Sequence, residues 1–129
     1  MIKEKLPAET LDFEIEFYEK LLKKNPDETT ILIPLGNAYT ERGLHEKGLS
    51  VDKKLVSLKQ DEPIFYYNLA CSFSLLKKQK EAVEALSKAL ELGYRDFEHM
   101  KIDHDLDNIR GDGLFKALLK KHKKSGSVK

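Results

Sequence analysis

The segment Leu-Ile-Pro-Leu-Gly-Asn-Ala-Tyr, residues 32–39, decides the fold because its pattern of side chains returns later in the chain. Residues 66–73, which lie 34 positions further on, are Tyr-Tyr-Asn-Leu-Ala-Cys-Ser-Phe. Each segment has a large residue, then Leu and a small residue, then an aromatic residue. Leu32 matches Tyr66, Leu35 matches Leu69, Gly36 matches Ala70 and Tyr39 matches Phe73. A fixed period of this length indicates a repeat architecture.

The same period extends beyond these two segments. Gly48 matches Ala82, and Leu55 matches Ala89, at the same offset of 34 residues. Apolar residues recur at spacings of three and four, which predicts amphipathic helices rather than strands. Pro, Gly and short polar turns separate these stretches. We therefore expect an all-α chain with about seven helices, near residues 10–24, 29–42, 45–58, 63–76, 80–92, 96–102 and 112–122.

Composition narrows the class of protein. The chain has 129 residues, of which 40% are hydrophobic and 35% charged, and its net charge of +1 gives no bulk argument for binding nucleic acid. A single cysteine, Cys71, excludes an internal disulfide. No apolar run approaches the length of a membrane span, and the first residues lack the apolar core of a signal peptide. We expect a cytoplasmic protein with neither nucleic acid nor membrane as a partner.

These repeated residues resemble the tetratricopeptide repeat (TPR) family. Its pattern is large-x-x-Leu-Gly-x-x-Tyr, followed by Ala-x-x-x-Phe, Ala and Pro. The chain departs from the pattern with Asp52 at the Phe position of the first repeat and with Lys77 where the turn Gly of the second repeat usually falls. The resemblance implies a right-handed superhelix of antiparallel helix pairs, a TPR-like α-solenoid.

The resemblance also implies a domain organisation. We expect a single TPR-like domain over residues 1–122 and a flexible tail over 123–129. The domain divides into a half repeat at 9–28, full repeats at 29–62 and 63–96, and a partial repeat with a cap at 97–122. Residues 105–115, Asp-Leu-Asp-Asn-Ile-Arg-Gly-Asp-Gly-Leu-Phe, are similar to the closing segment of many bacterial members, with Gly113 in place of Pro. This similarity implies a terminal cap and a bacterial source.

In this family the second, fifth, ninth, twelfth and thirteenth places of each repeat face a concave groove. The resemblance therefore implies a protein-binding groove made of Thr30, Ile33, Asn37, Thr40, Glu41, Ile64, Tyr67, Cys71, Ser74, Leu75 and Lys101. These side chains are mostly apolar, with a few hydroxyl and amide groups. Such a surface favours an extended or helical apolar peptide over a highly charged one.

The leading hypothesis is a non-enzymatic interaction module that binds a peptide or protein segment in this groove. The alternative is a self-associating structural unit that forms a homodimer through exposed helix ends. No Gly-rich phosphate loop, nucleophile elbow or paired zinc motif is present in the sequence. We therefore expect no catalytic residue, no metal and no cofactor.

Two weaker motifs have simpler interpretations. Residues 103–107, Asp-His-Asp-Leu-Asp, begin like a calcium loop, but Asn108 and Leu114 stand where that loop needs Gly and Glu. Helix-capping and turn-forming acids are the simpler interpretation. Asn37 and Asn68 match two places of a carboxylate clamp known in the family, but Ile33 replaces the first Lys of that clamp. Ordinary helix residues are again the simpler interpretation.

Overall fold

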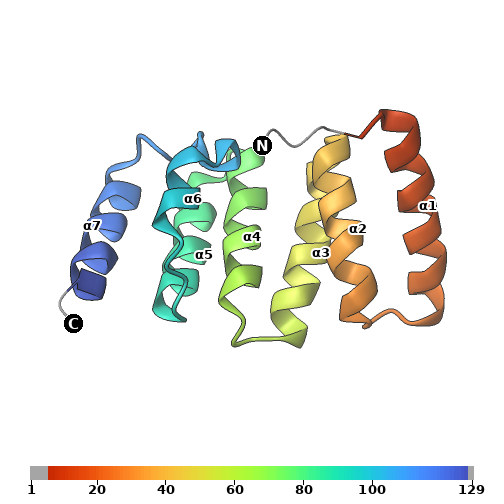
Figure 1. Ribbon diagram of the computed structural model, residues 1–129, viewed down its shortest axis with the longest axis horizontal. Coiled ribbons are helices and arrows are strands. Elements are labelled where there is room, and N and C mark those ends of the chain that lie inside the picture. Colours follow the sequence, from red (N-terminus) through yellow and green to blue (C-terminus); the bar gives the residue numbers. More distant parts are fainter. Residues whose placement is uncertain (1–5, 128–129) are drawn as a thin grey trace. The chain divides into compact units, whose positions relative to one another are not determined.

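The computed structural model describes residues 6–127, and this part of the chain contains seven α-helices, one short 3-10 helix and no strand (Figure 1). The helices are α1 (Ala8–Lys24), α2 (Thr29–Arg42), α3 (His45–Leu58), α4 (Pro63–Leu75), α5 (Gln79–Glu91), α6 (Phe97–Ile102), η1 (His104–Leu106) and α7 (Gly113–Ser127). They form two compact units, residues 1–58 (unit 1) and residues 59–129 (unit 2). The all-α class expected from the sequence is confirmed.

The first six α-helices begin and end close to the expected residues, and α2 and α3 match them at both ends. The last helix differs, because α7 continues to Ser127 and includes most of the stretch expected as a tail. Lys is a good helix former, and its positive charge is favourable near the negative C-terminal end of a helix. The Lys-rich sequence after residue 119 therefore supports further helical turns. The division into domains and repeats stays a prediction.

Similar turns follow α2 and α4. Gly43 ends α2 with a φ of 84°, and the Leu44 N–H donates to the Tyr39 carbonyl at 2.8 Å. Lys77 follows α4 with a φ of 61°, and the Lys78 N–H donates to the Phe73 carbonyl at 2.9 Å. Glycine adopts this left-handed geometry freely, whereas lysine does not. The turn therefore persists at Lys77 without its usual residue.

Unit 1 is built by packing α2 against both α1 and α3. Two glycines allow the close approach of α2 and α3. A Cβ atom at Gly36 would lie 3.1 Å from Val51 Cγ1, and one at Gly48 would lie 3.3 Å from Thr40 Oγ1. The absence of a side chain at these two positions therefore lets the helices approach closely.

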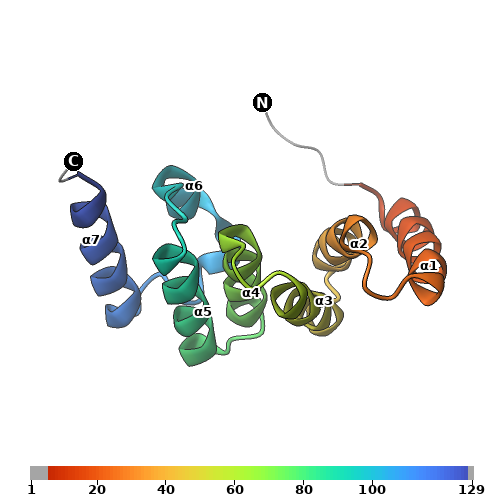
Figure 2. The same ribbon diagram turned by 90° about the horizontal axis from the view of Figure 1, so that it is seen from below.

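Unit 2 is built on the antiparallel pair α4 and α5, with α7 packed on α5 and η1 packed on α4 (Figures 1 and 2). Small residues again lie where the helices meet, because Ala70 and Ala82 are completely buried. The closing segment contributes Leu106 and Ile109, which are also completely buried. Residues 103–110 therefore belong to the core of this unit. None of the helices described is long and apolar enough to span a membrane.

Candidate functional site

The expected groove residues of unit 1 lie along one face of α2. Their spacing of three and four residues places them on consecutive turns of that helix. Thr30, Ile33, Asn37 and Glu41 are exposed, whereas Thr40 is half-buried and donates its hydroxyl to the Gly36 carbonyl at 3.1 Å. Most of the expected residues in this unit can therefore contact a partner.

This face of α2 borders a hollow of about 350 Å³ that it shares with α1. Its walls are formed by Leu6, Leu11, Glu14, Tyr18, Pro34, Asn37, Ala38 and Glu41. Asn37 and Glu41 belong to the groove expected from the sequence. Glu14 and Tyr18 do not, because α1 matches the second half of a repeat, for which the family pattern gives no groove positions.

The residues that line this hollow are both apolar and polar. Leu11 and Ala38 are buried apolar residues, and Glu14 and Glu41 are the acidic residues of the lining. Within residues 6–123, neither of these carboxyl groups has a hydrogen bond or an ion pair. Carboxyl groups that pair with no cation among these residues favour a ligand that supplies positive charge or N–H donors.

Two side-chain pairs hold α1 and α2 together beside the hollow. The Tyr39 hydroxyl donates to Glu19 Oε2 at 2.5 Å, and Arg42 Nε donates to Asp12 Oδ1 at 2.8 Å. Burial, together with the hydrogen bond to Glu19, raises the pKa of Tyr39 above its ordinary value. These pairs join residues 20 and 30 positions apart and link α1 to α2.

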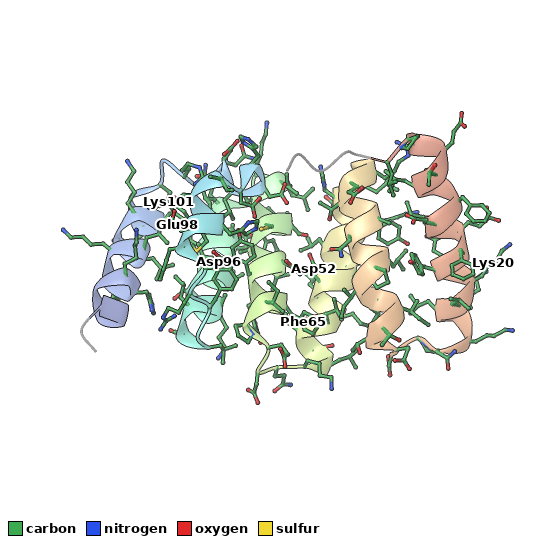
Figure 3. All side chains as sticks on the ribbon, viewed as in Figure 1. Lys20, Asp52, Phe65, Asp96, Glu98 and Lys101 are labelled. Carbon is green, nitrogen blue, oxygen red and sulfur yellow. The ribbon has the colours of Figure 1, made fainter. Side chains whose placement is uncertain are left out.

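The expected groove residues of unit 2 are placed differently. Tyr67 is 2% exposed, Cys71 7% and Ser74 0%, so these three side chains are buried. Ile64 is exposed and Leu75 is half-buried. Lys101 is exposed on α6 and pairs with Glu98 at 3.2 Å; Figure 3 labels both side chains. The residues expected at the centre of this surface are thus not open to solvent.

Residues 103–110, which we call the closing segment from here on, cover the inner face of α4. The Tyr67 hydroxyl donates to Asp103 Oδ2 at 2.6 Å, and Cys71 Sγ lies 3.8 Å from the same oxygen. Asn108 Nδ2 donates to the Ser74 carbonyl at 2.7 Å. These contacts occupy the positions where a partner was expected. Binding through the three buried side chains stays a prediction and requires this segment to move.

Asp103 is the centre of a polar network in this covered region. His99 Nε2 lies 3.2 Å from Asp103 Oδ2, and the Asp105 N–H donates to Asp103 Oδ1 at 3.0 Å. The Tyr67 ring stacks on Tyr94 with a centroid distance of 4.4 Å. Burial raises the pKa of Tyr67 above its ordinary range and that of Tyr94 to about 12. The neutral phenols are therefore part of the folded network.

Cys71, Asp103 and Asp105 bring three metal-ligand atoms within 4.8 Å of one another. The Asp103 carboxylate, however, is already bound by the Tyr67 hydroxyl and by a backbone N–H. The acids of this region act as caps and turn-formers, as the simpler interpretation expected. Asp103, for example, caps η1, and Asp112 accepts from the Leu114 N–H at 2.8 Å. We assign no metal to this cluster.

Arg110 holds the closing segment in place. Its Nη1 donates to the Met100 carbonyl at 2.9 Å, and its Nη2 donates to the Asp103 carbonyl at 2.6 Å. A guanidinium fork can bridge two carbonyl groups, whereas a lysine ammonium cannot match this planar geometry. Arg110 belongs to the sequence pattern of residues 105–115 that is similar to the end of bacterial family members. That pattern is therefore the one sequence signal that indicates the segment covering α4.

Comparisons with known proteins support the fold. No profile of a known protein family matches the chain. A chloroplastic protein of Arabidopsis thaliana is 30% identical over 93 residues, which is 70% of this chain and 28% of that protein. The chain thus spans about 28% of the length of this curated relative. The bacterial source and cytoplasmic location expected from the sequence stay predictions.

The solved structure of MamA, a TPR-like protein, is similar to the chain as a whole. The TM-score is 0.62 at 24% sequence identity, and the similarity covers 90% of this chain and 91% of MamA. At this identity the similarity shows the fold. The chain therefore has an all-α, TPR-like helical-repeat fold.

Proposed function

We propose that this protein is a non-enzymatic interaction module that binds a segment of a partner protein on the α1–α2 face of unit 1. The hollow between these helices is the observation that carries the proposal. Its volume of about 350 Å³ lies at the small end of the range for ligand pockets. It suits one or two side chains of a partner rather than a folded domain.

The lining of the hollow indicates the chemistry of the segment. Leu11, Pro34 and Ala38 offer apolar contact, and Asn37 offers amide hydrogen bonds. Glu14 and Glu41 favour a Lys or Arg side chain in the partner. The best fit is a short segment with an apolar residue beside a basic one. This partner is more basic than the sequence alone suggested, because α1 adds Glu14 to the surface.

The same carboxyl groups argue against a nucleic-acid partner at this face. A nucleic-acid backbone carries one negative charge per phosphate, so carboxyl groups at the contact surface would repel it. Exposed Ile33 and Thr30 extend the surface along α2 and supply contacts for an extended chain. The proposal therefore keeps a protein or peptide as the partner.

A display library of random peptides tests the proposal. Peptides selected on the wild-type protein should carry an apolar residue next to Lys or Arg. Their affinity should fall at least about tenfold in Glu41→Lys, which corresponds to about 1.4 kcal/mol. Glu81→Lys is the matched control, because Glu81 is also an exposed glutamate but lies on α5 in unit 2. Failure to enrich any peptide, or equal affinity for both variants, would contradict the proposal.

A further inference from the structure

Helix α1 has two apolar faces, of which only one packs against α2. Leu11 and Ile15 are buried on the packed face. Phe13, Phe17 and Leu21 are 73%, 52% and 37% exposed. Because their spacing is four residues, these three side chains form one stripe along consecutive turns. We call it the α1 stripe.

The α1 stripe is more than a scattering of surface residues. Single exposed apolar side chains are normal, whereas several in a row on one helix face mark an interaction surface. A helix that is apolar on opposite faces is typical of a helix covered on both sides. Figure 3 shows Lys20, a neighbour of the stripe on α1, on the side of the helix away from α2. None of the three stripe residues lines the hollow, so the stripe is a separate surface.

The charges along α1 indicate what covers the stripe. The acidic residues of α1 all lie before the basic residues Lys20, Lys23 and Lys24. Asp12 and Glu19 bind Arg42 and Tyr39 of α2 and Glu14 lines the hollow, which leaves Glu9 and Glu16 as the acidic residues outside these contacts. Two such helices packed in parallel would place like charges side by side. Packed antiparallel, they place the acidic end of each helix beside the basic end of the other. The helix is therefore complementary to a second copy of itself.

We propose that two copies of this chain form a homodimer by packing their α1 stripes antiparallel about a two-fold axis at Phe17. In this arrangement Phe17 meets Phe17 of the second copy, and Phe13 meets Leu21 of the second copy. Exposed Glu9 and Lys24 then lie near each other at both ends of the contact. The same patch serves both copies, as a two-fold interface requires. The inference is independent of peptide binding, because it uses another face of α1.

The size of the contact sets its strength. An interface made by one helix from each copy lies below about 1,200 Å², the class of weak and transient complexes. The dimer should therefore dissociate on dilution into the micromolar range. Sedimentation velocity from low micromolar to near-millimolar protein should show a shift from monomer to dimer. A wild-type protein that stays monomeric throughout this range would overturn the inference. The same result is expected if the stripe is covered by a helix of another protein.

A substitution in the stripe tests its location. Phe17→Asp should raise the dimer dissociation constant at least about tenfold, because it places a carboxylate at the two-fold axis beside its own copy. Ile102→Asp is the matched control, since Ile102 is 73% exposed, like Phe13, but lies on α6 in unit 2. Circular dichroism of both variants confirms that they are folded. An equal loss of dimer in the two variants would show that the stripe is not the interface.

Charge exchange tests the antiparallel orientation. Glu9→Lys and Lys24→Glu should each weaken the dimer severalfold at low salt, because each places like charges together. The double variant should restore the wild-type dissociation constant, because it exchanges the two charges and keeps the pair. If Glu9 and Lys24 of the two copies do not lie together, the double variant would not regain the wild-type dissociation constant. That result would overturn the proposed geometry.

A symmetric cross-link gives an independent readout. Phe17→Cys should form a disulfide-linked dimer on mild oxidation, since a residue on the two-fold axis lies next to its own copy. Ile102→Cys, in the same assay, should remain uncross-linked. The native Cys71 is buried, so it does not compete. Equal cross-linking of the two variants would contradict the position of the axis.

Discussion

Residue 77 shows how one side chain departs from the repeat pattern without changing the backbone. Lys77 has a φ of 61°, close to the 84° of Gly43 at the same place in the preceding repeat. A residue with a side chain loses roughly 1–2 kcal/mol of stability when it adopts this left-handed conformation. Replacing it with glycine recovers only part of this energy, because glycine also increases the entropy of the unfolded chain. The lysine therefore carries strain that the hydrogen bond from Lys78 N–H to the Phe73 carbonyl overcomes.

Lys77→Gly should consequently raise the free energy of unfolding by about 1 kcal/mol. The reverse change at the equivalent place, Gly43→Lys, should lower it by a similar amount. Urea unfolding followed by circular dichroism measures both. If the two variants shift the midpoint in the same direction, the equivalence of the two turns is wrong.

Buried phenols make the stability of unit 2 depend on pH. Burial and the charge of Asp96 raise the pKa of Tyr94 from 10.0 to about 12. Because the folded pKa is the higher one, the neutral phenol stabilises the fold fully below pH 10, and this contribution is lost as pH rises toward 12. Tyr67, stacked on Tyr94, is shifted in the same direction.

We therefore expect stability to fall between pH 10 and about 12, with Tyr94 ionising in that interval. Absorbance at 295 nm follows ionisation, and circular dichroism follows unfolding. Tyr94→Phe should remove part of the late absorbance change and make the fall in stability less steep. A Tyr94 that ionises near pH 10 while the protein stays folded would refute the burial of this phenol.

At the scale of the helices, the contact between α2 and α3 depends on the absence of a side chain at Gly36. A Cβ atom there would lie 3.1 Å from Val51 Cγ1, so a larger side chain must push the helices apart. Overpacking of this kind costs roughly 1–3 kcal/mol. Gly36, in the segment of residues 32–39, is thus one of the two glycines that allow the close approach of α2 and α3.

Gly36→Leu should lower the free energy of unfolding by roughly 1–3 kcal/mol in a urea titration. Gly111→Leu is the control, since a Cβ atom at Gly111 meets nothing within 4 Å, and its effect should stay within about 0.5 kcal/mol. Equal effects at the two positions would mean that α2 and α3 do not meet at Gly36.

Helix bounds were the part of the fold most open to prediction from sequence. Proline and glycine mark the ends of most helices, and their meaning is local, as at Pro63 and Gly43. The end of α7 has no clear signal of this kind. The sequence Ser-Gly-Ser suggested a tail, while the lysines before it favour a helix. Local signals conflict there, and the helix-forming lysines outweigh the Ser-Gly-Ser signal.

At the scale of the whole molecule, the candidate site could be predicted only in part. The family resemblance implied that Asn37 and Glu41 face a groove; both are exposed and line the hollow, and their role in binding stays a prediction. The covering of α4 depends on residues 36 positions apart, such as Tyr67 and Asp103, and no periodicity reports such a contact. The contribution of Glu14 was missed for the same reason, since it depends on how α1 meets α2.

The matching helices α2 and α4 therefore differ in what they expose. Asn37 and Cys71 occupy equivalent places, 34 residues apart, yet Asn37 is exposed beside the hollow and Cys71 is buried beneath residues 103–110. The proposed binding surface lies on unit 1, while the equivalent face of unit 2 is closed by its own chain. A groove that runs over both repeats stays a prediction.

Thiol labelling tests this claim most directly, because Cys71 is the single cysteine of the chain. Wild-type Cys71 should react with a thiol reagent at least about 100-fold more slowly than a cysteine introduced by Asn37→Cys in a Cys71→Ser background. This ratio corresponds to a local opening free energy of roughly 3 kcal/mol. The account predicts slow labelling at residue 71 and fast labelling at residue 37. Equal rates at the two positions would contradict it.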